Sequence, residues 1–507
     1  MSAPPLSRLM RLAERWRRLV PSRCADETAR SQALFVEACG LALDLRREWF
    51  DEETIAALVE FAHEQGLARG IAALFAGEPV LGAMSGPALY PALRGEGPAP
   101  AVAESLCALG AMETLAARLR EDPRSFGLQS VRHLIHVGIG GSLSGPRLIM
   151  DFLGPGQGPE VHFLGNADGR SLRALLAAID PNASLLLIAS KSFATAETLA
   201  NARSLIRALA ERRGLSEAEV LRATVAVTSR PERARDFGIG AKAILHLPEA
   251  VGGRYSSCSA ISFCLMLAHG ETAFRALLAG ASAMDRHFRE AAASANLPVL
   301  ASLADFWHRS ILGSGALCIL PYADRLAGLL PFVQQLFMES NGKGVDREGR
   351  PLPAPAAPVV FGQVGCDAEH ALLQWLAQGL EAVPVEFVAV PPEPGCALDR
   401  LRTDHLLAQW SRLAAPSEES APERRAAGPR PTRLLALKDS SPETLGALIA
   451  FYEHRAFAQS LLWGNDAFDQ WGVEAGKTLA RQIALSRAGQ ADPPSDPLLR
   501  EWLQRWP

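Results

Sequence analysis

The chain has 507 residues and a formal net charge of −4 at pH 7, and apolar side chains make up 48% of it. This length and composition predict two large or three smaller domains with a sizeable buried core. The charge argues against a nucleic-acid-binding protein, whose surface would need clustered Lys and Arg. An anionic small substrate would therefore have to be held by local positive groups.

The cysteines are scattered, and none forms a C-x-x-C pair. This pattern predicts reduced thiols in a cytoplasmic protein and neither a disulfide framework nor a zinc site. No apolar run reaches the ~18 residues of a membrane span, so we expect no membrane association. We also expect no cofactor, and no metal because no metal-ligand cluster appears in the sequence. The eight cysteines are Cys24, Cys39, Cys107, Cys258, Cys264, Cys318, Cys366 and Cys396.

Residues 1–95 are predicted to be helical, because charged residues occur among spaced apolar ones, as in DEETIAALVEFAHEQGLARGIAALF. Residues 1–20 are Arg-rich and amphipathic, as in a transit peptide. Glu14 is atypical of such a peptide, however, and the apolar core of a secretory signal is missing. We therefore favour a first helix that packs on the domain.

Predicted strands and helices then alternate, which is the pattern of an α/β protein with parallel sheets. We expect two tandem α/β domains, 96–280 and 281–490, each a parallel sheet flanked by helices, with helical N- and C-terminal extensions and a tail at 491–507. The Pro- and charge-rich segment 411–432 is predicted to be an exposed loop. The predicted strands lie within 133–138, 184–190, 223–229, 243–248, 315–322, 358–362 and 384–390.

Ligands of open parallel sheets bind where strands end and loops lead into helices. One such loop is Gly138-Ile139-Gly140-Gly141-Ser142. Its glycines let a ligand approach the backbone, and the helix N-terminus favours an anion. A tight strand-to-helix turn would need the same residues. The dinucleotide fingerprint fails because Leu143 occupies its third Gly position.

A second loop, Ser190-Lys191-Ser192-Phe193-Ala194-Thr195, also follows a predicted strand and precedes a helix that contains Glu197. Three hydroxyls, a Lys and a helix N-terminus suit a phosphate group. Helix capping would explain one hydroxyl but not all three. We therefore interpret this loop as a phosphate site.

Two charged residues come from loops or helix ends. Arg254 follows the pair Gly252-Gly253, which allows its guanidinium to project into a cleft, although a surface Arg is an alternative. Glu339 lies shortly before Asn341-Gly342, a helix stop, and is predicted in the last turn of its helix. A carboxylate there could act as a base, or it could simply be a solvated Glu.

Two more candidates lie in the C-terminal half. His370 closes the segment Gly365-Cys366-Asp367-Ala368-Glu369-His370, in which Asp367 is a predicted helix N-cap. A lone His is often structural. Lys477 belongs to Gly476-Lys477-Thr478, which resembles a P-loop, but the spacing from Gly472 to Gly476 is one residue too short.

Taken in order, these segments resemble the phosphoglucose isomerase (glucose-6-phosphate isomerase) family from about residue 40 to 485. QQLFMESNGKG and FDQWGVEAGK are highly specific matches, and VGIGGS, SKSFATAET, GGRYSSCSAI, the Glu-His pair at 369–370 and TLGALIAFYEH at 444–454 agree with them. The resemblance implies two sugar-isomerase (SIS-type) domains and a homodimer with shared active sites. It also implies a metal-independent aldose–ketose isomerase of glucose 6-phosphate and fructose 6-phosphate, working in glycolysis and gluconeogenesis.

The resemblance also implies roles for individual residues. Glu339 matches the base that moves a proton between C1 and C2, and Arg254 matches the cation that stabilises the enediolate. His370, supplied by the partner subunit, and Lys477 match the residues that assist ring opening. The phosphate-loop matches are Ser190, Lys191, Ser192 and Thr195, and the sugar-lining matches are Gly141, Ser142, Glu197 and Gln470.

The chain departs from the family pattern in several loops. Gly-Cys-Asp-Ala-Glu-His replaces Gly-Thr-Asn-Gly-Gln-His at 365–370, Leu-Ser-Gly-Pro replaces Asp-Leu-Gly-Pro at 143–146, and GAMSGPALYPALR at 82–94 lacks the usual Thr-Glu and Arg. Two alternatives follow from these changes. One is a catalytically weak sugar-phosphate-binding protein, and the other is an isomerase of another hexose phosphate.

Overall fold

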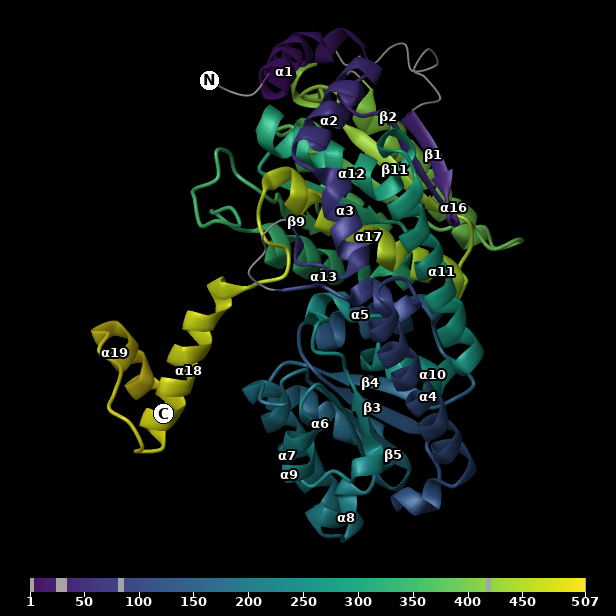
Figure 1. Cartoon of the computed structure of the whole chain (residues 1–507), viewed down its shortest axis with the longest axis vertical. Coiled ribbons are helices and arrows are strands. Elements are labelled where there is room, and N and C mark those ends of the chain that lie inside the picture. The colour runs from purple at the N-terminus through teal and green to yellow at the C-terminus, as the bar shows by residue number, and fades with distance from the viewer. Residues whose placement is uncertain (1–3, 24–33, 81–85, 416–420, 507) are drawn as a thin grey trace. The chain divides into compact units, whose positions relative to one another are not determined.

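A computed structural model describes residues 4–23, 34–80, 86–415 and 421–506. The chain divides into two compact units, Met1–Ala467 and Phe468–Pro507, and Figure 1 labels many of their elements. The first predicted helix is present as α1 (Pro4–Arg23). It packs on α2 (Glu52–Glu64), where Trp16 Nε1 donates to Thr54 Oγ1 at 3.1 Å, so the prediction of a first helix packed on the domain is confirmed.

The first sheet has five parallel strands in the order β4-β3-β5-β6-β7. Every residue of β5 and β6 is buried, as expected for strands covered by helices on both faces. Four of the strands lie in predicted runs, whereas β4 was not predicted. The bounds are β3 His133–Val137, β4 Glu160–Leu164, β5 Ser184–Ala189, β6 Thr224–Thr228 and β7 Ile244–His246.

The second sheet has six strands in the order β1-β2-β11-β10-β8-β9. Its strands β8 to β11 are parallel, so the prediction of two parallel sheets flanked by helices is confirmed. The hairpin of β1 and β2 adds an antiparallel edge against β11. The bounds are β1 Phe35–Ala38, β2 Leu41–Arg47, β8 Ala316–Pro321, β9 Val359–Gly362, β10 Val385–Ala389 and β11 Thr432–Leu437.

One sequence prediction is wrong in this region, and another is right only in part. Residues 35–47 were expected to be helical within 1–95, but they form the β1–β2 hairpin because pairing with β11 places Leu41, Leu43 and Leu45 in the core. The segment 411–432 was expected to be a loop. Its start is the end of α16, its last residue begins β11, and 416–420 lie outside the described residues.

Helices cover both sheets and fill the region between them. The helix α17 (Pro442–Trp463) is buried from Thr444 to Trp463 and packs against α11 (Glu271–Glu290) and α12 (Leu297–Phe306). Gly446 permits the close crossing of α17 and α11, because a Cβ there would overlap the backbone carbonyl of Leu277. No helix in the described ranges is both long and apolar enough to cross a bilayer. The other helices of this unit are α3 Leu67–Ala76, α4 Ala99–Glu121, α5 Gly141–Leu153, α6 Gly169–Ala178, α7 Ala196–Arg213, α8 Glu217–Leu221, α9 Pro231–Asp236, α10 Phe263–His269, α13 Leu329–Gln334, α14 Gly365–Glu369, α15 Leu373–Gln378 and α16 Ala397–Ala414.

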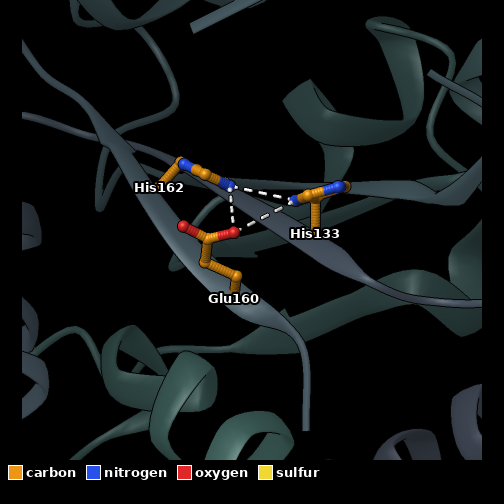
Figure 2. A group of neighbouring side chains, drawn as sticks. All are labelled: His133, Glu160 and His162. Carbon is orange, nitrogen blue, oxygen red and sulfur yellow. Dashed lines mark hydrogen bonds and ion pairs between the residues drawn. The ribbon is translucent and has the colours of Figure 1, made fainter. Parts of the chain in front are cut away.

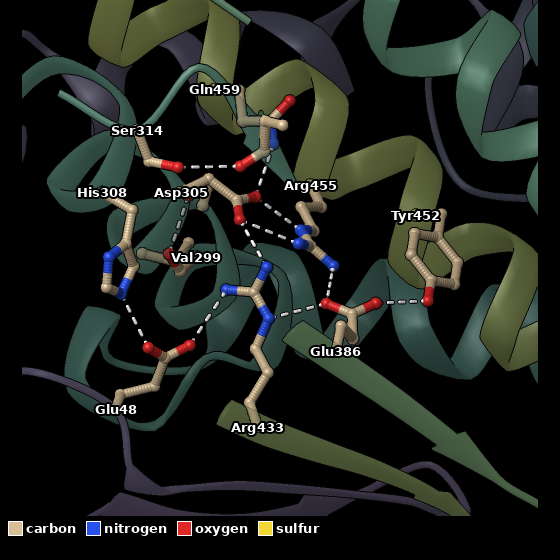
Figure 3. A network of polar contacts seen from close by, with 12 residues as sticks. Glu48, Val299, Asp305, His308, Ser314, Glu386, Arg433, Tyr452, Arg455 and Gln459 are labelled. Carbon is tan, nitrogen blue, oxygen red and sulfur yellow. Dashed lines mark hydrogen bonds and ion pairs between the residues drawn. The ribbon is translucent and has the colours of Figure 1, made fainter. Parts of the chain in front are cut away.

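A buried ionic network ties the second sheet to these helices (Figure 3). Arg433 of β11 donates to Glu386 of β10 at 2.7 Å and to Asp305 of α12 at 2.6 Å. Arg455 of α17 donates to the same two carboxylates. Burial raises the pKa of Asp305, but Arg433 and Arg455 outweigh this and bring it to about 2. All four side chains are ion-paired, as buried charges must be.

The second unit is helical and begins at Phe468, inside the range predicted for the second domain. It contains α18 (Glu474–Arg487) and α19 (Pro497–Arg505). Asp496 caps α19 by accepting from the backbone N–H groups of Leu498 and Leu499. The predicted tail at 491–507 therefore includes a short capped helix.

Candidate active site

Two of the predicted loops meet at Gly141. This residue begins α5, directly after β3 and the positive-φ residue Gly140. A Cβ on Gly141 would lie 2.6 Å from the backbone nitrogen of Arg254 and would overlap Gly253. Only glycine therefore allows the loop after β3 to pack on the loop that carries Arg254.

Arg254 is buried and held from several sides. Its Nε donates to Ser340 Oγ at 2.7 Å, and one terminal nitrogen donates to the carbonyl oxygen of Ala467 at 2.5 Å. The other terminal nitrogen lies 3.5 Å from Glu339 Oε1. Only 5% of Arg254 is exposed, so the alternative that it is a surface residue is wrong.

Glu339 occupies the last turn of its helix, as predicted, and the helix continues only to Asn341. Residues Gln335–Glu339 form a π-helical turn after α13, a feature often found at functional sites. Gln335 Nε2 donates to Glu339 Oε2 at 2.9 Å. Gln335 Oε1 in turn accepts from Ser144 Oγ at 2.9 Å. One carboxylate oxygen thus faces Arg254 and the other is fixed by an amide, while 26% of the side chain stays exposed.

Ser340 connects this pair to the core. Besides accepting from Arg254, its hydroxyl lies 3.0 Å from the hydroxyl of Tyr255. Tyr255 stacks on Tyr90 with ring centroids 4.9 Å apart, and burial raises the pKa of Tyr255 to about 12. Tyr255 therefore stays a neutral phenol. The fixed partners of Ser340 hold the Arg254 guanidinium in one place.

The loop at 190–195 lies between β5 and α7. Ser190 is buried, and its Oγ lies 3.3 Å from Thr195 Oγ1. Thr195 is the N-cap residue of α7, yet its side chain makes no capping hydrogen bond. The first-turn N–H groups of an 18-residue helix therefore face this loop without a side-chain cap, which suits an anion. Ser192 is exposed beside them.

Lys191 links this loop to the Arg254 loop. Its Nζ donates to the backbone oxygens of Glu249 at 2.7 Å and Val251 at 2.9 Å. Burial lowers the pKa of Lys191, although Glu249 raises it. The sequence suggested a direct phosphate contact for this ammonium group, whereas the geometry directs it to the chain just before Gly252.

Two predicted sugar-lining residues flank these loops. Ser142 is half-buried in the first turn of α5, and its carbonyl oxygen accepts from His136 Nε2 at 2.7 Å. Burial lowers the pKa of His136 to about 4, so its imidazole is neutral and donates that hydrogen bond. Glu197 is exposed in the first turn of α7.

His370 is exposed at the C-terminal end of α14. The prediction that Asp367 caps this helix is wrong, because the N-cap position is Val364 and Asp367 lies inside the first turn. The preceding residue, Glu369, accepts from Tyr322 and Gln409 at 3.1 Å each and contacts His405. These contacts fix the loop that presents His370.

Gln470 and Lys477 belong to the unit Phe468–Pro507 and are described within it. Lys477 is the fourth residue of α18, as expected of a Lys just inside a helix, and pairs with Glu474 at 2.8 Å. Gln470 is exposed before the turn Trp471–Val473. The structure thus brings together Gly141, Ser142, Arg254 and Glu339 on one side, and Ser190, Lys191, Ser192 and Thr195 on the other, joined through Lys191.

Sequence reasoning did not assign roles to Gln335, Ser340, Tyr255 or Ser144. Gln335 could have been found, because a residue four positions before Glu339 shares its helix face. Ser340, Tyr255 and Ser144 lie beside predicted site residues in the sequence, but their hydrogen bonds join segments far apart along the chain, which no local pattern indicates. The sequence also predicted no metal-ligand cluster, whereas two such groups occur in the described ranges: His133, Glu160 and His162, and Cys366, Glu369 and His405.

Comparisons with known proteins agree on one family. The family model "Phosphoglucose isomerase" matches residues 44–492. The chain is 40% identical to a glucose-6-phosphate isomerase of Rhizorhabdus wittichii, over 94% of both chains. It is 37% identical to one of Cupriavidus metallidurans, over 92% of this chain and 91% of that one. The crystal structure of a glucose-6-phosphate isomerase from Chlamydia trachomatis matches with a TM-score of 0.87 at 28% identity, covering 100% of this chain and 98% of that one.

Proposed function

The chain belongs to the phosphoglucose isomerase family, and on that premise we propose that it interconverts glucose 6-phosphate and fructose 6-phosphate with Glu339 as the base and Arg254 as the stabilising cation. The ion pair between these two side chains carries the assignment. A carboxylate beside a fixed cation can take a proton from a carbon next to a carbonyl, because the cation stabilises the charge that develops on the oxygen.

The proposed reaction needs a single base. The Glu339 carboxylate removes the proton from C2 of the open-chain aldose, and the electrons of that C–H bond form the C1–C2 double bond. The C1 carbonyl oxygen becomes negative and is stabilised by Arg254. The C2 hydroxyl then gives its proton to the C1 oxygen, Glu339 returns its proton to C1, and the C2 ketone results. Atoms and electrons balance without a redox partner.

The phosphate group binds at the loop 190–195. Ser190, Ser192 and Thr195 supply hydroxyl groups, and the uncapped N-terminus of α7 supplies backbone N–H donors. Lys191 contributes by holding this loop against the chain before Arg254. These hydrogen bonds tie the phosphate loop to the loop that carries Arg254. The family pattern assigns the sugar contacts to Gly141, Ser142, Glu197 and Gln470.

Ring opening is assigned to His370 and Lys477, with His370 supplied by the partner subunit of a homodimer. The exposure of His370 at the end of α14 supports this role, since a side chain that serves a neighbouring subunit must lie at the surface. A cytoplasmic location is also part of the proposal, and the free cysteines among the described residues support it.

The test is a coupled assay with fructose 6-phosphate, glucose-6-phosphate dehydrogenase and NADP. Glu339→Gln keeps the size of the side chain and the hydrogen bond from Gln335, but it removes the base. We expect kcat to fall about 10²- to 10⁴-fold. Glu381→Gln, at an exposed site, is the matched control and should turn over like the parent. Full activity of Glu339→Gln would refute the assignment.

A binding assay separates the isomerase from a mere binder. A sensor would bind fructose 6-phosphate without turnover, and it would have no need for a base poised against Arg254. An isomerase of another hexose phosphate would prefer mannose 6-phosphate when the two aldose phosphates are assayed in parallel. We expect turnover in the parent and a preference for glucose 6-phosphate.

A further inference from the structure

Two neighbouring strands of the first sheet bring two imidazoles and a carboxylate to one face. The strands β3 and β4 are parallel, and their register pairs His133 with Glu160 and Ile135 with His162. Side chains alternate between the two faces of a strand, so His133, Glu160 and His162 all project from the same face. His133 thereby becomes a neighbour of Glu160 and His162, which lie 27 and 29 positions further along the chain.

The three ligand atoms converge (Figure 2). His133 Nδ1 lies 3.1 Å from His162 Nε2, and each of these nitrogens lies 3.7 Å from Glu160 Oε2. In the plane of these three atoms, the point equidistant from them is about 2.0 Å from each, which is the usual Zn–N and Zn–O bond length. Small side-chain movements would therefore be enough to hold an ion together with a fourth ligand, without rearrangement of the strands.

The exposure of the group suits a metal ion. The side chains of His133 and His162 are 14% and 15% exposed, whereas that of Glu160 is 69% exposed. Water can thus reach the remaining coordination position.

We propose that His133, Glu160 and His162 bind a divalent transition-metal ion, for which Zn²⁺ is the best match. Two imidazoles and a carboxylate are a common zinc ligand set, with water as the fourth ligand. The second group, Cys366, Glu369 and His405, is a weaker candidate, because Glu369 already accepts hydrogen bonds from Tyr322 and Gln409.

The position of the site indicates a structural role. It lies at the amino end of β3, whereas Gly138 and Gly141 follow the carboxyl end of the same strand. A five-residue strand spans about 15 Å, so the ion is outside the reach of the substrate. Because β4 is an edge strand, an ion shared by β3 and β4 would hold that edge in place.

The test is calorimetric titration of the full chain with Zn²⁺ after treatment with EDTA and removal of the chelator. We expect one Zn²⁺ per chain and a rise in melting temperature on binding. His162→Gln should weaken this binding at least about 10-fold and abolish the rise, since even outer-shell changes have effects of that size. Glu160→Gln changes the exposed ligand and should also weaken Zn²⁺ binding. This second variant tests the site even if His162→Gln misfolds.

Two controls identify the ligands. His246→Gln removes an exposed histidine paired with Glu104 alone and should bind Zn²⁺ like the parent, as should Cys366→Ser. Turnover of fructose 6-phosphate by metal-free His162→Gln verifies its fold. Binding by His162→Gln and Glu160→Gln equal to the parent, loss of binding in Cys366→Ser, or no stoichiometric binding in the parent would overturn the proposal.

Discussion

Ser340→Ala tests whether the position of the Arg254 guanidinium sets the rate. Ser340 Oγ accepts from Arg254 Nε at 2.7 Å and lies 3.0 Å from the Tyr255 hydroxyl, and all three side chains are buried. A hydrogen bond to a charged group contributes about 1.5–3 kcal/mol. If roughly half of that energy, about 0.8–1.5 kcal/mol, is lost when the enediolate charge develops, kcat falls about 4- to 12-fold, since 1.4 kcal/mol corresponds to a factor of ten.

Steady-state kinetics and urea unfolding separate this effect from general destabilisation. We expect kcat to fall while KM changes less than about twofold, because Arg254 acts at the developing oxyanion more than on bound substrate. Ser302→Ala is the matched control: it removes another buried serine hydroxyl, which donates to the carbonyl oxygen of Val299 at 2.7 Å in α12. Both variants should lower the urea midpoint, but only Ser340→Ala should lose kcat. Equal kcat values in the two variants would refute the reasoning.

Three further predictions address other parts of the protein. Gly141→Ala should reduce kcat/KM about 100-fold, because the new Cβ displaces the loop at Gly253. Gly110→Ala, with open space around its Cβ, should leave kcat/KM unchanged in the same assay. Lys191→Met should raise KM for fructose 6-phosphate about 10-fold, through loss of two hydrogen bonds that hold the phosphate loop, and unchanged KM would contradict the link. Asp305 has its pKa depressed to about 2 when folded, so the stability it contributes is present above pH ~4 and is lost as pH falls toward 2. Asp305→Asn should destabilise the protein by about 3–5 kcal/mol at pH 7. Its melting temperature should also fall less steeply than that of the parent as the pH is lowered. An unchanged slope of melting temperature against pH would argue against the depressed pKa.

Much of the fold could be predicted because its buried strands are locally encoded. SLLLIA at 184–189 and ALCILP at 316–321 are short apolar runs that end at a helix-starting loop, and both are fully or nearly fully buried strands. β4 was missed because its sequence EVHFL carries a charge and a histidine, as suits an edge strand. β2 was missed because LALDLRR contains three charged residues, one of which, Asp44, is buried by pairing with Arg46.

The candidate site was predicted as separate loops, since each motif carries its own chemistry. Glycines before a helix, hydroxyls around a helix N-terminus and a Glu before Asn-Gly can all be recognised within a few residues. That Arg254 and Glu339 form one pair could not be found in this way. The 84 residues between them do not fix their distance until α10 to α13 and the second sheet are packed.

The sequence by itself determined the α/β class, most strands, the helix end at Glu339 and the loop chemistry, because these depend on periodicity and on backbone preferences of near neighbours. Only the tertiary structure decided that Gly141 packs against Gly253, that Lys191 joins two loops, and that His133 meets His162. These contacts follow from strand order and register, which are set by burial of surfaces far apart in the chain. A register shifted by one residue would turn Glu160 and His162 to the opposite face and dissolve the proposed metal site.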